Sequence, residues 1–405
     1  MVSSAITGGY TSINKTASPQ NDPTMKQKIF FIDPQSMSNL AEYDYSVTSE
    51  MDCDLTYLCS KHYDYTVNER IKYVRVFSYN YKKGVAKIIS YLFSLLHILL
   101  LIIRQRPVLV HIQWFKIPQI DFLFWSLAKK AFSFRIVHTA HNILPHNTGD
   151  RYKNIYTRIY RELADSIIVH DNSTREKLAR EMDVDTDKIT VIRHGLLKMR
   201  YDMRKYEGLH LPTSSQNAIK DRIVFVSLGE QSYYKGSDLI IDAWTSTPSL
   251  NQSDRCALVI AGKITGIDVK DIGRFGNVIV RNERISNEEY MFWLRHADAY
   301  LLPYRAISQS GALLTALSVH LPVITSDIGG ISEPTEVAEV GWNMGQPSVE
   351  NLRKALCSIV DDPDSLKAIK GDAESWEKIE KFYDWKDISR RTQSLYEKLL
   401  RQRAT

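Results

Sequence analysis

A regular alternation of short apolar runs with longer amphipathic segments constrains the fold of this 405-residue chain more than any other feature. The short runs are typical of buried strands, and the longer segments carry apolar residues at helical spacing. Strands that alternate with helices in this way predict doubly wound parallel sheets, and therefore an α/β fold. The first series comprises predicted strands 28–32, 108–113, 134–139, 166–169 and 189–192, with helices 85–104, 119–132, 151–163 and 172–181.

A second series follows a basic and then polar stretch, 198–220, whose glycine, proline and serines are typical of an inter-domain connection. Two α/β domains of similar size are therefore expected to face each other across a cleft, where doubly wound sheets bind their ligands. The second series comprises predicted strands 222–227, 256–261, 277–280, 298–302 and 322–325, helices 236–245, 286–295 and 311–319, and further helices after 348. The predicted boundaries are 25–200 for the first domain, 201–220 for the linker, 221–380 for the second domain and 381–405 for a C-terminal helix.

Two stretches near the N-terminus show no regular alternation of strand-like and helix-like segments. Residues 1–24 are polar, rich in Ser and Thr, and lack the apolar core of a signal peptide, so we expect a disordered leader or a cloning remnant. Residues 35–83 mix Tyr, Asp and short apolar pieces, which predicts irregular strands and loops. The four cysteines follow neither a disulfide nor a zinc spacing, which indicates reduced thiols in a cytoplasmic protein.

Positive charge is concentrated in the first half of the chain. Residues 1–205 contain 29 Lys and Arg against 20 Asp and Glu, a net charge of +9; subtraction from the totals of 52 and 47 leaves a net charge of −4 for the rest. The first half should therefore meet an anionic partner, such as a nucleic acid, an anionic bilayer or a diphosphate-linked substrate. The longest apolar run, 88–103, is shorter than the about 20 residues of a spanning helix. Helix 85–104 is expected either to cover the sheet or to lie on a membrane surface.

One candidate phosphate site follows the first strand of the second series. The segment Val226-Ser-Leu-Gly-Glu-Gln-Ser-Tyr-Tyr-Lys-Gly236 takes this strand into Gly229, then a short loop, and then a predicted helix start at Lys235. A lysine beside the free N–H groups of a helix N-terminus suits a diphosphate. The ordinary alternative for Lys235 is a solvated lysine at the start of a helix.

Two later loops are further candidates. In Tyr304-Arg-Ala-Ile-Ser-Gln-Ser-Gly311, hydroxyl groups and helix N–H groups could bind phosphate oxygens, although each serine could simply be an N-cap. In Asp327-Ile-Gly-Gly-Ile-Ser-Glu333, two glycines permit positive φ and a glutamate could accept hydrogen bonds from ligand hydroxyls, unless the segment is only a structural turn. The candidates in these loops are Tyr304, Ser308, Ser310, Gly311, Thr315, Gly329, Gly330 and Glu333.

Histidines mark the candidate site in the first series. The segment Val137-His-Thr-Ala-His-Asn-Ile-Leu-Pro-His146 closes a predicted strand and opens a loop at the cleft. His138 lies within the strand and could be a core histidine, whereas His141 and Asn142, at the strand end, point to a substrate. A zinc site is disfavoured because the histidine spacing lacks a supporting carboxylate or cysteine.

These motifs resemble the GT-B glycosyltransferases, especially family 4 and its relatives. The loop that ends at Lys235 is similar to the family's Gly-Arg-x4-Lys-Gly donor loop, but Glu230 stands where the family often has arginine. Many family 4 enzymes carry two glutamates separated by seven residues around this loop, and Ser308 and Thr315 stand nearest to those two positions here, so the carboxylate pair is absent. The segments 329–333 and 139–142 resemble the family's Gly-Gly-x-x-Glu and Thr-x-His-Asp/Asn motifs, and Arg193-His194-Gly195 is similar to its Pro-Asn/His-Gly turn. The resemblance implies that His141 and Asn142 are catalytic and that His138 and Tyr304 contact the acceptor or the sugar.

The resemblance implies two Rossmann-like domains, of which the second holds a nucleoside-diphosphate sugar as substrate, without a metal or cofactor. It implies a retaining transfer to a saccharide or polyprenyl-diphosphate-linked saccharide, as in the synthesis of surface polysaccharides or glycoconjugates, with no nucleic-acid partner. Such acceptors would lie at the inner face of the cytoplasmic membrane, which helix 85–104 could contact. The C-terminal helix would cross back to the first domain, or be an ordinary surface helix.

Two other function classes stay open at this point. One is a sugar-nucleotide 2-epimerase or a phosphorylase on the same fold. The other is a non-catalytic GT-B-like partner subunit, which the substitutions at Glu230, Ser308 and Thr315 would fit.

Overall fold

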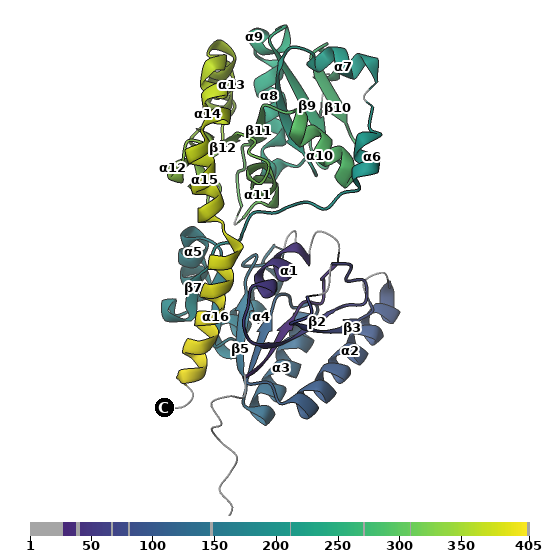
Figure 1. Cartoon of the computed structure of the whole chain (residues 1–405), viewed down its shortest axis with the longest axis vertical. Helices are drawn as coiled ribbons and strands as arrows, with labels where there is room; N and C mark the ends of the chain where they lie inside the picture. Colours follow the sequence, from purple (N-terminus) through teal and green to yellow (C-terminus); the bar gives the residue numbers. More distant parts are fainter. Residues whose placement is uncertain are drawn as a thin grey trace, which may run out of the picture.

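The structure is a computed structural model that describes residues 27–37, 41–65, 68–79, 82–145, 149–210, 212–269, 272–307 and 309–402. The predicted leader 1–24 and the candidate Ser308 lie outside the described residues. Two parallel sheets with helices on their faces lie one above the other (Figure 1), which confirms the predicted α/β class. We call the unit built on the first sheet the N-terminal domain and the other the C-terminal domain.

The N-terminal domain contains a seven-stranded sheet in the order β3-β2-β1-β4-β5-β6-β7. Neighbouring side chains of β1 enter different cores: Phe30 packs with helices on one face, whereas Phe31 packs with helices on the other. The strands are β1 (Lys28–Ile32), β2 (Asp54–Ser60), β3 (Lys72–Phe77), β4 (Leu109–Ile112), β5 (Arg135–Thr139), β6 (Ser166–Val169) and β7 (Ile189–Val191). The helices are α1 (Glu42–Ser49), α2 (Gly84–Gln105), α3 (Pro118–Phe132), α4 (Lys153–Arg158), which continues in a wider turn to Leu163, and α5 (Asn172–Met182).

The C-terminal domain contains a six-stranded sheet in the order β10-β9-β8-β11-β12-β13. Its strands are β8 (Ile223–Leu228), β9 (Cys256–Ala261), β10 (Val278–Arg281), β11 (Ala299–Leu302), β12 (Val323–Thr325) and β13 (Gly341–Asn343). Its helices are α8 (Ser237–Thr245), α9 (Pro248–Asn251), α10 (Asn287–His296), α11 (Gly311–Leu317), α12 (Glu333–Val337), α13 (Val349–Asp361), α14 (Pro363–Gly371) and α15 (Ala373–Phe382). In both sheets the strand order reverses beside the first strand, so the carboxyl ends of the strands form a crevice there.

Two regions are more regular than the sequence predicts. Residues 35–83 contain helix α1 and strands β2 and β3, which pair in parallel with the rest of the sheet. Helix α1 has no apolar stripe because it is buried on several sides, so its sequence shows no helical periodicity. The predicted linker 201–220 also contains two short helices, α6 (Met203–Glu207) and α7 (Thr213–Ile219).

The last helix, α16 (Trp385–Arg401), leaves the C-terminal domain and packs on the N-terminal domain (Figure 1). Its apolar side chains belong to the same core cluster as α1 and the strands β1, β2 and β4. The Ser389 hydroxyl donates to the carbonyl of Val47 at 2.7 Å, and the Tyr396 hydroxyl lies 2.5 Å from Nδ1 of His111. This helix therefore completes the N-terminal core and ties the two domains together.

Candidate functional site

A cavity of about 330 Å³ lies between the two domains and brings together several predicted donor residues. We call it the cleft cavity. Glu42 and Tyr65 reach it from the N-terminal domain, and residues 197–199 reach it from the connecting segment. The C-terminal domain contributes Leu228, Gly229, Lys235, Tyr290, Gly311, Ala312 and Thr315.

Lys235 lies over the loop that follows β8. A Cβ atom built at Gly229 would lie 3.8 Å from Nζ of Lys235, so the ammonium group stands just above this glycine. The sequence predicts that Lys235 opens a helix, but it ends a 3-10 turn, Tyr233–Lys235, and α8 begins at Ser237. The reason is Gly236, whose φ of +71° interrupts the helical path. Burial lowers the pKa of Lys235, and Glu230 acts against this shift.

Hydrogen bonds hold this loop against its neighbours. The buried Gln231 side chain accepts from the hydroxyls of Ser227 and Ser237, both at 2.9 Å, and donates to the carbonyl of Gly229 at 3.0 Å. The Arg305 guanidinium donates to both oxygens of Asp238 at 2.6 Å, which joins the loop after β11 to helix α8. The backbone around Lys235 is therefore fixed before any ligand binds.

Gly262 supports the same loop, and its replacement by alanine is a stability test of it. Its φ is +143°, and an added Cβ would collide with the carbonyl of Gly229. We expect Gly262→Ala to lower the free energy of unfolding by about 2–4 kcal/mol. Gly273→Ala is the control, because a Cβ atom added at Gly273 would meet nothing within 4 Å. Urea unfolding followed by circular dichroism measures both; equal losses in the two variants would contradict the close approach.

Two of the predicted donor-loop residues have a supporting role. The Ser310 hydroxyl accepts from the N–H of Leu313 at 3.2 Å, so it is the N-cap of α11, and it donates to the hydroxyl of Tyr304 at 3.3 Å. Tyr304, expected to contact sugar or acceptor, is only 4% exposed and stacks on Tyr234. Neither side chain lines the cleft cavity, so both support the loop through these contacts.

The turn from Gly329 to Glu333 also differs from its predicted donor contact. The Glu333 carboxylate accepts from Arg193 of the N-terminal domain at 2.8 Å and 3.1 Å. A Cβ built at Gly330 would lie 2.9 Å from Cβ of Asp171, which belongs to the N-terminal domain, and Gly329 lies against the carbonyl of Ile307. This turn therefore makes a contact between the domains, and its residues do not line the cleft cavity.

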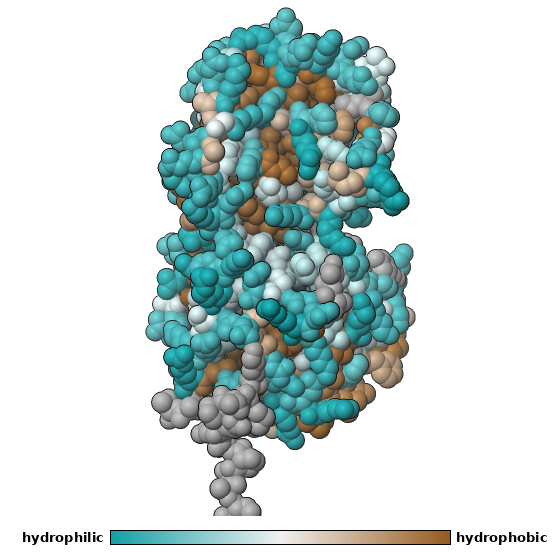
Figure 2. All heavy atoms as spheres, in the orientation of Figure 1, coloured by the Kyte–Doolittle hydropathy of each residue, from teal (hydrophilic) through white to brown (hydrophobic). Residues whose placement is uncertain are grey.

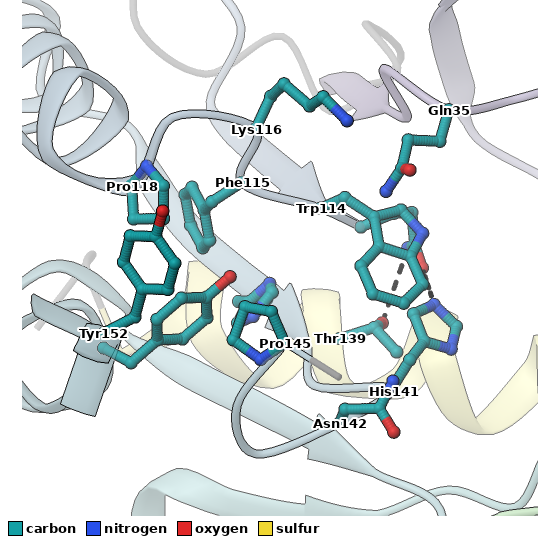
Figure 3. A pocket seen from close by; sticks show the side chains of 13 residues that line it. Gln35, Trp114, Phe115, Lys116, Pro118, Thr139, His141, Asn142, Pro145 and Tyr152 are labelled. Atoms are coloured by element: carbon teal, nitrogen blue, oxygen red, sulfur yellow. Dashed lines mark hydrogen bonds between the residues drawn. The ribbon is translucent and has the colours of Figure 1, made fainter. Parts of the chain in front are cut away.

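A second cavity, of about 350 Å³, lies at the carboxyl ends of β1, β4 and β5 (Figure 3). We call it the aromatic pocket. Trp114, Phe115, Pro118, Pro145, Tyr152 and Tyr156 supply most of its apolar wall. Its polar groups come from Gln35, Gln113, Lys116, His138, Thr139, His141 and Asn142. Flat apolar rings beside a few polar groups suit the faces and hydroxyls of a sugar.

His141 occupies the centre of a hydrogen-bonded group. Its Nε2 lies 2.8 Å from Oε1 of Gln113, and its ring stacks on Trp114 with centroids 4.8 Å apart (Figure 3). His170 donates from Nδ1 to the carbonyl of Ile192 at 2.9 Å, and its Nε2 lies 3.1 Å from Nδ1 of His141. Burial, and then the nearby His170 and His194, lower the pKa of His141 well below its ordinary value.

His138 is a buried histidine that also reaches the aromatic pocket. It is buried, it donates from Nδ1 to the carbonyl of Ile112 at 2.8 Å, and burial lowers its pKa to about 4. It nevertheless lines the aromatic pocket, as does the neighbouring Asn142. Among the side chains that the structure describes, no group of three or more His, Cys, Asp and Glu is arranged to hold a metal ion.

The two cavities adjoin through helix α1. Glu42, at its start, lines the cleft cavity, whereas the next residue, Tyr43, packs edge-on against His141 with centroids 4.9 Å apart. Successive residues of α1 therefore face the cleft cavity and the wall of the aromatic pocket.

Several site residues were missed in the sequence. Gln113 and Trp114 directly follow β4, and His170 directly follows β6. They therefore lie at the same edge of the sheet as His141, which follows β5. Glu42 and Lys198 gave no such signal, because they lie in the irregular stretch and in the predicted connection.

Two family models match separate parts of the chain. The model described as Glycosyl transferases group 1 matches residues 220–362, and the model described as Glycosyltransferase Family 4 matches residues 48–196. A curated relative, glycogen synthase of Mycobacterium tuberculosis, is 24% identical over 238 residues, which cover 58% of this chain and 54% of the relative. The chain therefore spans about half the length of the curated relatives it matches.

Solved structures share the fold over nearly the whole chain. Sucrose-phosphate synthase from Thermosynechococcus elongatus has a TM-score of 0.68 at 16% identity, and the match covers 93% of this chain and 100% of that one. Anabaena Alr3699/HepE in complex with UDP-glucose has a TM-score of 0.61 at 12% identity, covering 91% and 99%. At these identities the likeness shows the arrangement of two Rossmann-like domains and no more.

Proposed function

Because the chain belongs to the GT-B glycosyltransferases of the group 1 and family 4 type, we propose that it transfers a glycosyl group from a nucleoside-diphosphate sugar to a saccharide hydroxyl. The donor occupies the cleft cavity, and the acceptor occupies the aromatic pocket. The observation that carries this proposal is the Lys235 ammonium group, held over Gly229 in a cavity whose lining includes Glu42, the residue before Tyr43, which packs on His141. The relative solved with UDP-glucose supports a nucleotide sugar as the donor.

The proposed reaction retains the anomeric configuration. The bond between the anomeric carbon and the diphosphate breaks, and Lys235 stabilises the negative charge of the departing group without a metal ion. A phosphate oxygen of that group takes the proton of the incoming hydroxyl, which forms its bond on the same face of the sugar. His141, held by His170 and Gln113, positions the sugar or the acceptor at the junction of the two cavities.

A donor screen tests this proposal. The protein is incubated with UDP-, GDP- and ADP-sugars, with and without mixed saccharide acceptors, and release of nucleoside diphosphate is measured. We expect release with one base, and faster release when the right acceptor is present. Release of free epimerised sugar without an acceptor would favour an epimerase, and no nucleotide binding at all would favour a non-catalytic partner.

We also propose that the acceptor is linked to a lipid and that the protein meets an anionic membrane. Helix α2 is long and apolar enough to span a bilayer by length and composition, yet its Tyr91, Leu95, Ile98 and Ile102 are buried in the core. Its outer side and the neighbouring side of α3 form what we call the apolar face, seen as brown spheres at the lower right of Figure 2. This face consists of Val85, Ile88, Ile89, Leu92, Phe93, Leu96, Leu100, Ile103, Leu123 and Leu127, which are 44–70% exposed.

Basic side chains surround this face, so a negatively charged surface suits it better than an uncharged one. Lys82, Lys83 and Lys87 stand near the start of α2, and Arg104 and Arg106 near its end. Apolar residues between cationic groups are typical of helices that lie in the membrane interface. A helix in this position would bring a lipid-linked saccharide close to the N-terminal domain.

Charged substitutions on the apolar face test the membrane contact. We expect the double variant Phe93→Glu, Leu96→Glu to bind vesicles containing phosphatidylglycerol at least about 10-fold more weakly, because two apolar side chains leave the interface. Vesicle co-sedimentation measures binding, with phosphatidylcholine vesicles as the uncharged comparison. Gln252→Glu, an exposed change on the C-terminal domain, is the control. Equal binding by the double variant and the wild type would contradict the contact.

A further inference from the structure

We propose that Lys198 is the second cation for the donor diphosphate and reaches it from the segment that connects the domains. This inference rests on the proposed function. Lys198 and Lys235 line the same cleft cavity, although 37 positions separate them in the chain. The loop after β8 supplies one lysine and, at Glu230, an acid, so it carries no net positive charge of its own. A diphosphate needs more positive charge than this loop provides.

Packing on both sides fixes the backbone at Lys198, whose side chain is exposed. Leu196 is buried in the core of the C-terminal domain, and its carbonyl accepts from the indole N–H of Trp385 at 2.9 Å. Leu197 and Met199 pack against the same core. A Cβ built at Gly311 would lie 3.4 Å from Cδ1 of Leu197, so this segment runs directly beside the start of α11. Lys198 is therefore held by the C-terminal domain, on the same side of the cleft as Lys235.

Lys198 lies near two charged groups, Arg200 and Glu42, and its own charge acts on the Glu42 carboxyl. Arg200, two residues further on, donates to the carbonyl of Asp64 at 3.0 Å and lies over the ring of Tyr65, so its charge is engaged by the N-terminal domain. Glu42 is the carboxylate that lines the same cavity. Within the described part of the chain, neither Lys198 nor Lys235 makes an ion pair with a carboxylate. Among the residues that line the cavity, the two lysines outnumber the one acid, Glu42, although Glu230 acts on Lys235 from outside the lining.

Calorimetric titration of the full chain with UDP, GDP and ADP, and with their nucleosides, tests the proposal. For the diphosphate that the wild type binds, we expect Lys198→Ala to raise Kd by about 10- to 100-fold. Binding of the nucleoside should change less than about 2-fold, because it lacks the phosphates that Lys198 contacts. Lys198→Arg should recover most of the affinity, and Lys205→Ala, an exposed lysine on α6, should bind like the wild type.

The outcomes separate this inference from the proposed function. Wild-type binding of a diphosphate with an unchanged Kd in Lys198→Ala would overturn the role of Lys198 and leave the donor site standing. Equal weakening of diphosphate and nucleoside would also overturn it, since that pattern indicates a structural change in the cavity. Failure of the wild type to bind any of the three diphosphates would overturn both proposals. Thermal unfolding of each variant shows whether the fold is retained.

Discussion

Replacing Lys235 with alanine is expected to lower the rate of glycosyl transfer by about 100-fold or more. The variant loses the ammonium group that stands over Gly229, and with it the positive charge that stabilises the departing diphosphate. Because Lys235 is partly buried in a low-dielectric cavity, water replaces this charge poorly. Initial rates of nucleoside diphosphate release and of transfer measure the effect, at donor concentrations well above KM.

Two further variants make this result interpretable. Lys263→Ala removes an exposed lysine near the end of β9 and should react like the wild type. Lys235→Arg keeps the charge but changes its geometry, so we expect an intermediate rate. Donor hydrolysis and transfer that continue unchanged in Lys235→Ala would rule out this loop as the donor site.

Replacing His141 with alanine is expected to lower transfer by about 10- to 100-fold while the Kd for the nucleoside diphosphate stays within about 3-fold. The Kd should change little because His141 lines the aromatic pocket and not the cleft cavity, where the diphosphate is proposed to bind. Loss of the ring also removes the stacking partner of Trp114. In addition, it removes the ring nitrogens that Gln113 and His170 contact. Transfer rates and calorimetry with the diphosphate separate the two effects.

The pH dependence follows from the lowered pKa of His141. A histidine whose pKa lies well below 6.5 gains its charge only at acid pH, so His141 is neutral from pH 6 to 8. We expect no acid limb from this ring in the rate profile over that range, in the wild type or in His141→Gln. An acid limb with its midpoint near the ordinary pKa of histidine, present in the wild type and absent in His141→Gln, would contradict the buried neutral ring.

Local pattern was enough to predict the frame of the site. Predicted strands 256–261 and 166–169 match β9 and β6, because strands buried on both faces are continuous apolar runs. Ligands of doubly wound sheets bind at the carboxyl ends of the strands, and residues selected on this ground do line cavities. One cavity is lined by Gly229, Lys235, Gly311 and Thr315, and the other by His138, His141 and Asn142.

Contacts between distant segments could not be predicted in the same way. Glu333 was expected to meet donor hydroxyls because its motif allows it, but its carboxylate is bound by Arg193 from the other domain. Tyr304 lies in a polar loop by sequence, yet it is buried against Ser310 and Tyr234. Glu42 lies on α1, and the position of α1 depends on its packing against the C-terminal helix α16. Each of these outcomes depends on how distant segments pack and how the two domains dock, and no local spacing encodes that.

The most direct test of the central claim is a crystal structure of the protein with the nucleoside diphosphate that it binds most tightly. Our account predicts the diphosphate in the cleft cavity, within hydrogen-bond distance of Nζ of Lys235 and beside the backbone of Gly229. A nucleotide bound instead in the aromatic pocket, or with its diphosphate turned away from Lys235, would contradict it.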